Sequence, residues 1–355
     1  MDTINFAQSL KVAGEQKLSS EIRIGLIGCG YWGPNLIRNF HENPQANLVV
    51  VADLKQERLN FIHNSYPEVK LIADYHEMYS MGLDAIVIAT PPTTHYEIAK
   101  DVIQHGYNVM IEKPLTLRSD HAIELIELAR KNDVTLMVGH AFEYNIAVQT
   151  LKSMIANGDL GEVHYIDSAR LNLGLYQHGL NVLWDLAPHD FSILCYILGQ
   201  EPISVTAQGT SCVAKHIIDV AYINLRFPGN ILAHVHVSWL DPYKVRRVTV
   251  VGSKKMVVFN DVDNDKIKIV DKGVGVTING AASSFNEFQY SYRNGDILIP
   301  FIKFVEPLKV ECQHFLDCIR EHRPPVTDGE DGLRVVRILE AAQRSLENNS
   351  REELL

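Results

Sequence analysis

The chain has 355 residues, of which 46% are hydrophobic and 21% charged, the composition of an ordinary soluble globular protein large enough for two domains. Its 33 basic and 43 acidic residues give a net charge of −10, which argues against a protein that coats nucleic acid, because such binding depends on many cation–phosphate contacts. No stretch approaches the roughly 18 consecutive apolar residues of a membrane span. Five cysteines without C-x-x-C spacing, and no apolar signal segment at the start, predict a cytoplasmic protein with reduced thiols.

Five short runs rich in β-branched residues alternate with helical patterns in the first part of the chain. Each run is apolar throughout instead of alternating, which is typical of strands buried on both faces of a parallel sheet. The repeated β-α-β pattern predicts a doubly wound Rossmann domain over residues 21–144, preceded by an arm of residues 1–20. The predicted strands span residues 22–27, 48–53, 84–89, 107–111 and 134–138, and the clearest helices span 34–43, 93–104 and 119–132.

The pattern changes after residue 145, where a predicted helix over residues 145–156 is followed by strands in succession. Tight turns join these strands, as at residues 228–230, which is typical of a mostly antiparallel sheet. Two helical patterns close the chain. We therefore expect an α+β domain over residues 145–355. Its strands are predicted at 163–171, 203–209, 221–227, 231–238, 246–251 and 256–260, and its last helices at 306–321 and 331–346.

The first predicted strand runs directly into the pattern G-x-G-x-x-G, formed by Gly28, Gly30 and Gly33 and followed by a helix. The first glycine permits the tight turn, the second lets the backbone approach a pyrophosphate, and the third allows close packing of helix on strand. A diphosphate at the helix N-terminus is favoured by free N–H groups and by the helix dipole. We predict a dinucleotide site here that includes Tyr31 and Trp32; the alternative is a glycine-rich turn that binds nothing.

Asp53 ends the second predicted strand, where an acidic side chain accepts hydrogen bonds from a ribose diol. A carboxylate at this position repels a 2′-phosphate, so the sequence favours NAD over NADP. Lys55 and Arg58 lie close by and partly offset that repulsion, which keeps NADP as a possible cofactor.

Two polar stretches follow the ends of further predicted strands, where ligands bind in open α/β sheets. Glu112 and Lys113 precede a proline, and Lys113 is placed to face a nicotinamide ring. The alternative interpretation is that Lys113 is a surface residue in a turn. Thr90, Pro91 and His95 form the second stretch. We expect the histidine to be structural or to line the cofactor site, and not to donate a proton.

Asp185 and His189 are four residues apart, so on a helix both side chains point the same way. A histidine titrates near neutrality and can exchange a hydroxyl proton, while the carboxylate anchors a second hydroxyl or tunes the base. The alternative is a buried Asp–His hydrogen bond. Pro188 suggests that the helix begins near it.

His234 and His236 lie on one face of a predicted strand, where two imidazoles could begin a metal site. No third ligand accompanies them at metal spacing, and the prediction is that the protein holds no metal. Lys244, Arg246 and Arg247 place three cations close together. A nucleotide-sugar diphosphate needs such a patch, but the sequence favours a strand with a solvated charged face.

Together, the glycine loop, the stretch 90–95, the Glu-Lys-Pro at 112–114 and the Asp185/His189 pair resemble the Gfo/Idh/MocA oxidoreductase family over residues 22–346. The resemblance implies an open-faced substrate sheet, oligomer contacts through it, and hydride transfer between a nicotinamide and a carbinol carbon. It also implies that Lys113 lies beside the reacting hydroxyl, with the proton passing to Lys113 or His189, and that Asp185 and Asn145 contact substrate. Many members carry an arginine near Glu143, where this chain has an acid.

Segments 184–190 and 329–336 are most similar to members in surface-polysaccharide and nucleotide-sugar pathways, such as the UDP-N-acetylglucosaminuronate 3-dehydrogenases. The resemblance therefore implies oxidation of a ring hydroxyl, at C3, of a sugar or nucleotide sugar. Alternatives are a 3-keto-sugar reductase, a cyclitol dehydrogenase, an NAD-dependent glycosidase and a non-enzymatic NAD sensor, the last disfavoured by the intact Lys113, Asp185 and His189. We expect a homodimer or homotetramer that covers apolar residues on the sheet, with Trp239, Tyr222 and Val235 among or near them.

Overall fold

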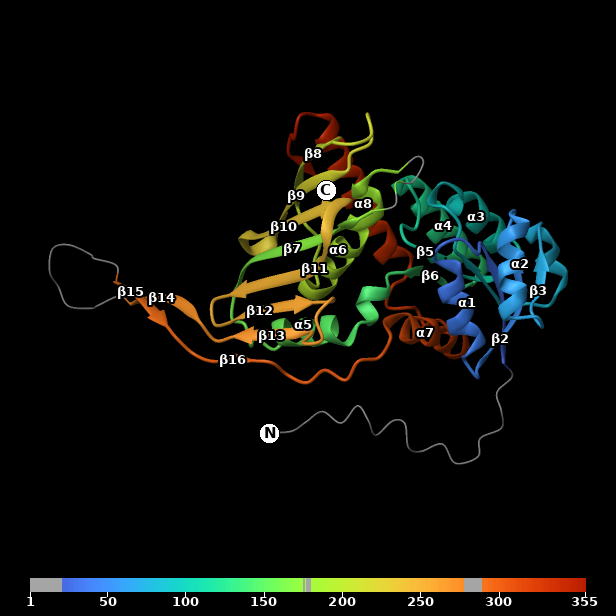
Figure 1. The fold of residues 1–355 in the computed structure, drawn as a ribbon, viewed down its shortest axis with the longest axis horizontal. Helices are drawn as coiled ribbons and strands as arrows, with labels where there is room; N and C mark the ends of the chain where they lie inside the picture. Colours follow the sequence, from blue (N-terminus) through green and yellow to red (C-terminus); the bar gives the residue numbers. More distant parts are fainter. Residues whose placement is uncertain (1–20, 175, 177–179, 278–288) are drawn as a thin grey trace, which may run out of the picture. The chain divides into compact units, whose positions relative to one another are not determined.

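The structure, a computed structural model, describes residues 21–174, 176, 180–277 and 289–355 (Figure 1). The predicted arm of residues 1–20 lies outside the described residues. The chain forms two compact units, one ending at Ala89 and the other running from Thr90 to Leu355. The predicted domain boundary at residue 144 stays a prediction.

The first unit alternates strands and helices as predicted, and its apolar strands are buried almost throughout. In β1, for instance, Ile24 and Leu26 are fully buried, as expected where helices cover both faces of a parallel sheet. Sequence analysis missed the short strand β3. The elements are β1 (Ile22–Ile27), α1 (Gly33–His41), β2 (Ala46–Ala52), α2 (Gln56–Ser65), β3 (Lys70–Ile72), η2 (Tyr75–Ser80) and β4 (Ala85–Ile88).

The second unit begins with the remaining part of the Rossmann pattern. Its α4 covers the predicted range, Ser119–Asn132, and ends at Asp133 in the left-handed conformation, a common helix stop. The elements are η3 (Pro92–Thr94), α3 (His95–Gln104), β5 (Asn108–Glu112), α4, β6 (Leu136–Gly139), η4 (Ala141–Tyr144) and α5 (Ile146–Ala156). The six strands follow the order β3-β2-β1-β4-β5-β6, and the pairs β1–β2, β1–β4, β2–β3 and β5–β6 are parallel, as expected for a Rossmann sheet.

A nine-stranded sheet dominates the rest of the second unit, in the order β16-β13-β12-β11-β7-β10-β9-β8-β17. Its pairs are antiparallel except β7–β10, which confirms the mostly antiparallel prediction. The strands are β7 (Val163–Leu173), β8 (Ser204–Thr210), β9 (Val220–Phe227), β10 (Ile231–Ser238), β11 (Leu240–Gly252), β12 (Met256–Asn260), β13 (Ile267–Val270), β16 (Ile297–Leu298) and β17 (Glu353–Leu354). The hairpin β14 (Gly273–Thr277) and β15 (Gln289–Arg293) forms a separate sheet.

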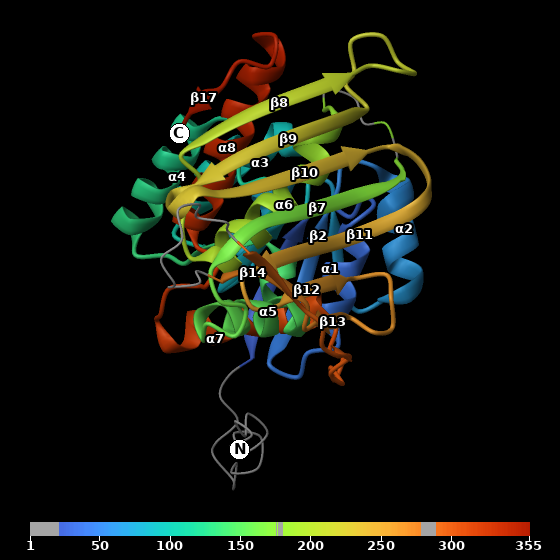
Figure 2. The same cartoon turned by 90° about the vertical axis from the view of Figure 1, so that its left-hand side faces the viewer.

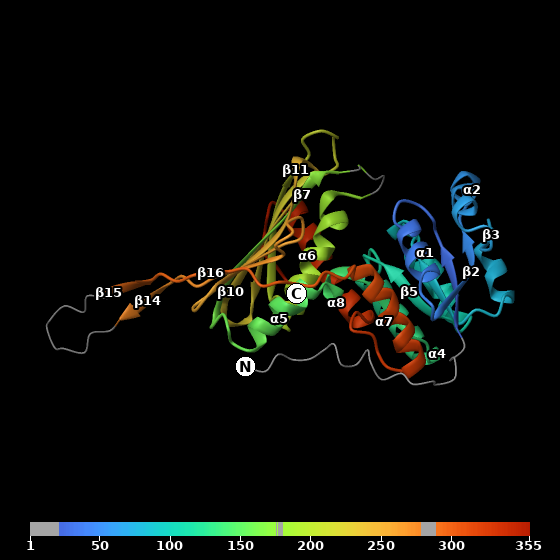
Figure 3. The ribbon, with the colours of Figure 1, turned by 60° about the horizontal axis from the view of Figure 1, so that its bottom comes forward.

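Helices of this unit cover one face of the nine-stranded sheet and leave the other open, so far as the described residues show (Figures 2 and 3). The covering helices include α6 (Val182–Leu198) and α8 (Gly329–Glu347), while α7 (Pro307–Glu321) packs against η4. The alternation of β9 sends Ala221, Ile223 and Leu225 into the core and leaves Tyr222 exposed. Two residues expected near the apolar surface patch are core residues instead, since Val235 and Trp239 are 0% and 1% exposed.

The helix that carries the Asp185/His189 pair begins earlier than predicted. Pro188 lies inside α6, six residues beyond its first residue, Val182, and does not mark its start. Asn181 caps the N-terminus by accepting a hydrogen bond from the Trp184 backbone N–H at 3.2 Å. An apolar helix that packs on the sheet has enough tertiary contact to tolerate the hydrogen bond that proline removes. Because α6 begins at Val182, Asp185 and His189 lie on one helix, four residues apart.

Candidate functional site

The glycine loop of the first unit connects β1 to α1 and has the conformation that only glycine adopts easily. Gly28 has φ +96°, a region that other residues rarely enter. A Cβ atom on Gly33 would lie 2.3 Å from the Gly28 carbonyl oxygen, so the third glycine is required for the helix to approach the strand. Tyr31 and Trp32 are 83% and 40% exposed at the tip of the loop. The backbone here fits a diphosphate at the N-terminus of α1.

Asp53 is fixed beside this loop by hydrogen bonds to both carboxylate oxygens. Its Oδ2 accepts from the Cys29 backbone N–H at 2.9 Å, and its Oδ1 accepts from the Lys55 N–H at 2.8 Å. The Arg58 Nη1 lies 3.3 Å from Oδ2 and also above Gly30. Burial by itself raises the pKa of Asp53, but these hydrogen bonds outweigh it and lower the pKa, which keeps the carboxylate ionised. An ionised carboxylate has further lone pairs for the hydroxyls of a ribose.

His95 in the second unit connects the two loops that follow β4 and β5. Its side chain is fully buried, with Nδ1 2.9 Å from the Pro114 carbonyl oxygen and Nε2 2.8 Å from that of Thr90. Burial lowers the pKa of this imidazole. The contacts support the structural half of the prediction for His95. Thr90 also accepts a hydrogen bond from the Thr94 hydroxyl at 2.8 Å, and Pro91 is exposed; cofactor contacts by these residues stay predictions.

Lys113 and Asp185, far apart in sequence, meet at the end of β5. The Lys113 Nζ donates to the Asp185 backbone oxygen at 2.7 Å and lies 3.6 Å from its carboxylate Oδ1. The other carboxylate oxygen accepts from the Trp239 indole N–H at 3.0 Å. Glu112, just before Lys113, places its carboxyl 3.1 Å from a Cβ built on Gly139. Lys113 is therefore not a free surface side chain, and the Asp185 carboxylate has a fixed orientation.

His189 lies one helical turn beyond Asp185 and is partly buried. Its ring packs edge-on against Phe142, with centroids 5.2 Å apart. Burial is the first cause that lowers the pKa of His189 well below its ordinary value, and the positive charges of Lys113, Arg170 and Arg246 lower it further. A histidine kept neutral in this way is able to accept a proton.

Arg170 and Asp190 form a buried ion pair between β7 and α6 behind this region. The Arg170 Nε donates to Asp190 Oδ2 at 2.6 Å, and the Ser168 hydroxyl donates to Asp190 Oδ1 at 2.6 Å. The guanidinium also lies 4.5 Å from the centroid of the Phe142 ring. Arg170 and Phe142 were missed by the sequence analysis; the available signal was a charged residue in a predicted strand, among apolar and small neighbours.

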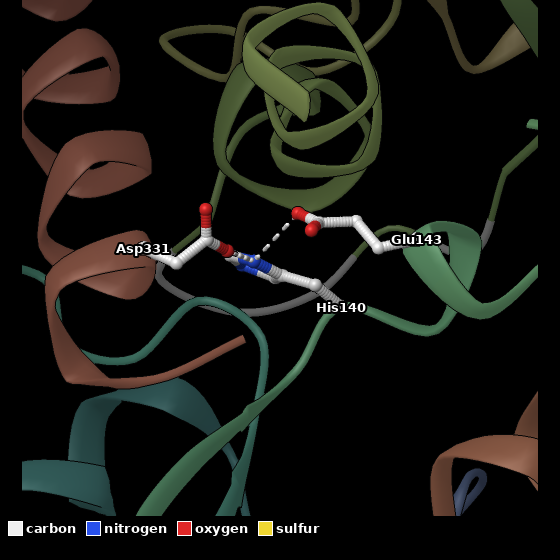
Figure 4. Close-up of side chains that lie close together, drawn as sticks. All are labelled: His140, Glu143 and Asp331. Atoms are coloured by element: carbon white, nitrogen blue, oxygen red, sulfur yellow. Dashed lines mark hydrogen bonds and ion pairs between the residues drawn. The ribbon is translucent and has the colours of Figure 1, made fainter. Parts of the chain in front are cut away.

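His140, Glu143 and Asp331 form a buried polar cluster, shown in Figure 4. The imidazole Nδ1 lies 2.6 Å from Asp331 Oδ2 and 3.9 Å from Glu143 Oε1. Arg334 donates to the other Asp331 oxygen at 2.7 Å, and Ser192 donates to Glu143 at 2.6 Å. Burial and the Asp331 charge raise the pKa of Glu143, which favours the neutral form of this acid.

This cluster has the spacing of a metal site as well, since one donor atom from each of the three residues lies within 4.8 Å of the others. Its members already bond to one another, to Arg334 and to Ser192, which ties η4 to α6 and α8. A cavity of about 370 Å³ lies beside it. The absence of a metal from this protein stays a prediction.

Three other predicted residues have clear structural surroundings. Asn145 is the N-cap of α5, accepting from the Ala147 N–H at 2.9 Å, while its amide nitrogen lies 3.5 Å from Asp261. His234 and His236 do share one face of β10, where they stack on Tyr222. The substrate contact of Asn145 stays a prediction.

Comparison with known proteins supports the same assignment in both parts of the chain. Residues 22–140 match the model of an oxidoreductase family with an NAD-binding Rossmann fold, and residues 148–258 match the GFO/IDH/MocA C-terminal domain. The chain belongs to the Gfo/Idh/MocA family. It is an oxidoreductase with an NAD-binding domain, as predicted from the glycine loop and Asp53.

The relatives of this Gfo/Idh/MocA member include one enzyme named for an inositol and one named for a nucleotide sugar. It is 27% identical to the myo-inositol 2-dehydrogenase of Thermotoga maritima, over 92% of this chain and 96% of that protein. It is also 27% identical to the UDP-N-acetylglucosamine 3-dehydrogenase of Acidithiobacillus ferrooxidans, over 89% and 94% of the two chains. Among solved structures, GenD2 from gentamicin A biosynthesis, in complex with NAD, has the same fold, with a TM-score of 0.81, 23% identity and coverage of 97% and 99%. None of the helices in the described part is long and apolar enough to span a bilayer.

Proposed function

We propose that this protein transfers hydride between NAD and a ring hydroxyl, at C3, of a sugar or nucleotide sugar. The observation that carries the proposal is the meeting of Lys113, Asp185 and His189 at one end of α6. An ammonium, an oriented carboxylate and a neutral imidazole are the groups that a carbinol needs if it is to lose a proton while its carbon loses hydride. Relatives that act on sugars and cyclitols support this class of substrate.

The roles follow from the contacts of each side chain. Lys113, held by the Asp185 carbonyl, donates a hydrogen bond to the reacting oxygen and stabilises the negative charge that develops there. His189 is the base that takes the hydroxyl proton, unless that proton passes to Lys113. Asp185, fixed by Trp239, accepts a hydrogen bond from a second hydroxyl of the ring. Bound NAD supplies the hydride acceptor, and Asp53 with the glycine loop would hold it.

A cyclitol dehydrogenase is the second candidate, favoured by the similarity to myo-inositol 2-dehydrogenase over almost the whole chain. The same site serves the reverse reaction, reduction of a 3-keto sugar, since a catalyst accelerates both directions. An NAD-dependent glycosidase would use the same first oxidation but release an aglycone without net NADH.

The proposal is tested by mixing the purified protein with NAD or NADP and a panel of nucleotide sugars, free sugars and inositols. We expect NADH to form with a sugar or nucleotide sugar, and little NADPH. Formation with inositols alone assigns the cyclitol activity, and aglycone release without NADH assigns the glycosidase. No reduced cofactor and no aglycone with any compound contradicts the proposal.

We also propose a homodimer or homotetramer that covers the open face of the nine-stranded sheet. Tyr165, Tyr222 and Leu232 are 49%, 43% and 49% exposed on strands of that sheet, and apolar surface of this kind is commonly covered by another chain. Light scattering that finds a monomer at working concentration contradicts this expectation.

A further inference from the structure

Arg170 has one guanidinium N–H group that the described protein does not use. The side chain is 2% exposed, and its Nε and Nη2 are directed at Asp190 at 2.6 and 3.5 Å. Its Nη1 is buried and has no hydrogen-bond partner among the described residues. Buried donors are almost always paired, so this nitrogen points to a group that arrives with a ligand.

Asn172, two residues further along β7, offers a matching acceptor. Its Oδ1 is buried and likewise has no partner in the described ranges. Residues two apart on a strand face the same way, and Arg170 faces α6 through Asp190. An unused donor and an unused acceptor therefore lie next to one another on the side of the sheet that carries His189.

Positive charge is concentrated around the same point. Arg246 on β11 is the direct cross-strand neighbour of Arg170, and like charges in that position destabilise a sheet. The pKa of Lys244 is lowered first by the charge of Arg246 and then by burial, with a smaller contribution from Arg170, while the carboxylate of Asp261 raises it. Asp190 balances one of these cations and is fully occupied by Arg170 and Ser168.

The cations lie next to the predicted acid/base group. Phe142 receives the edge of His189 with centroids 5.2 Å apart, and the same ring has the Arg170 guanidinium 4.5 Å from its centroid. Arg170 and His189 thus contact one aromatic ring. Arg247 is different: it is exposed, and its Nη2 lies 3.8 Å from Asp167 on a neighbouring strand.

We propose that Arg170, Arg246 and Lys244 bind an oxyanion, a carboxylate or a phosphate, that the substrate carries on the same sugar as the hydroxyl that faces His189. Asn172 accepts a hydrogen bond from a neighbouring substrate hydroxyl. The proposal rests on the proposed function for the position of the reacting hydroxyl. It selects sugar acids or sugar phosphates over neutral cyclitols, because a guanidinium pairs with two oxygens of a carboxylate or phosphate.

Arg246→Gln is the main test variant, with Arg247→Gln as its control on the same strand. Arg170→Lys is the second variant, since it keeps the charge beside Asp190 and removes the planar fork of donors. Circular dichroism and thermal unfolding establish that each variant is folded. The NAD-loaded protein is then titrated in a calorimeter with glucuronate, glucose 6-phosphate, glucose and myo-inositol.

We expect glucuronate or glucose 6-phosphate to bind about tenfold or more tightly than the two neutral compounds. Tighter glucuronate identifies a carboxylate as the anion, and tighter glucose 6-phosphate identifies a phosphate. Arg246→Gln and Arg170→Lys should each remove most of this preference, and Arg247→Gln should keep it. Equal or undetectable binding of the charged compounds, or the same loss in Arg247→Gln, overturns the proposal.

A parallel assay for NADH separates this result from the proposed function. A preference for the anionic compounds, without NADH from any sugar, contradicts the proposed function and supports the oxyanion site. NADH from a neutral sugar, with no preference for anionic compounds, supports the proposed function and overturns the oxyanion site.

Discussion

The glycine loop of the first unit and the Lys113–His189 cluster of the second are built in opposite ways. The loop consists of adjacent residues whose backbone shape is the functional feature, and Gly33 is required because any Cβ meets the Gly28 carbonyl. The cluster consists of side chains from separate segments, with Lys113 after β5, Asp185 and His189 on α6, and Trp239 directly after β10. Substitutions that change the backbone shape should therefore disrupt the loop. Substitutions that change the charge or the position of a side chain should disrupt the cluster.

The largest effect is expected from Lys113→Met, which keeps the length of the side chain and removes its charge. The rate of hydride transfer should fall by about 10²–10⁴-fold, the usual contribution of a positioned proton-transfer or charge-stabilising group. NAD binding, measured by fluorescence titration, should fall far less. The control is Lys100→Met, which removes a lysine that pairs with Glu124 on the neighbouring helix. Equal losses in the two variants would contradict the role of Lys113.

Gly33→Ala tests the other side of the comparison. The new methyl group would lie 2.3 Å from the Gly28 carbonyl oxygen, so helix and strand must move apart. We expect a loss of about 2 kcal/mol or more in the free energy of unfolding, together with loss of NAD binding. In Gly30→Ala the nearest atom is the flexible end of Arg58, at 3.3 Å, and the loss of stability should be smaller. Urea unfolding with and without NAD measures the stability and the NAD binding of each variant. Equal stabilities of Gly33→Ala and Gly30→Ala would contradict the requirement for glycine at position 33.

A smaller effect is expected from Trp239→Phe, which removes the indole N–H that orients Asp185. A hydrogen bond to a charged group contributes about 1.5–3 kcal/mol, so kcat/KM should fall about tenfold to hundredfold. Trp184→Phe is the control, because that indole donates to Gln343 at 3.3 Å and not to the carboxylate. If the two variants lose activity equally, Trp239 contributes packing and does not position Asp185.

The smallest change is a shift in pH dependence for Arg246→Gln. Burial lowers the pKa of His189 first, and the charge of Arg246 is one of the causes that lower it further, so removing that charge raises the pKa. Oxidation needs the neutral imidazole and is lost as the pH falls through this pKa. The acid limb of the kcat/KM profile should therefore move to higher pH. An unmoved limb would indicate that the proton goes to Lys113 instead of His189.

The sequence predicted most of the fold, and the reason is that its signals are periodic. Apolar strands buried on both faces, and the helix over residues 119–132, follow from local patterns and were confirmed. Errors occurred where tertiary contacts override local rules. Pro188 lies inside a helix because α6 packs on the sheet. Trp239 is buried in the hydrophobic core, where Asp185 accepts a hydrogen bond from its indole N–H.

The sequence by itself indicated a dinucleotide loop, which the family match supports. It also predicted an acidic group for a ribose, and a lysine, aspartate and histidine for a hydroxyl. Each of these signals is a short motif of neighbouring residues, whereas the contact between Lys113 and Asp185 is made only in the folded chain. Only the tertiary structure decided that Arg170 and Arg246 are cross-strand neighbours near His189, and that Arg247 pairs with Asp167 instead. Strand pairing joins residues far apart in the chain, and a single sequence contains no local record of which residues it will bring together.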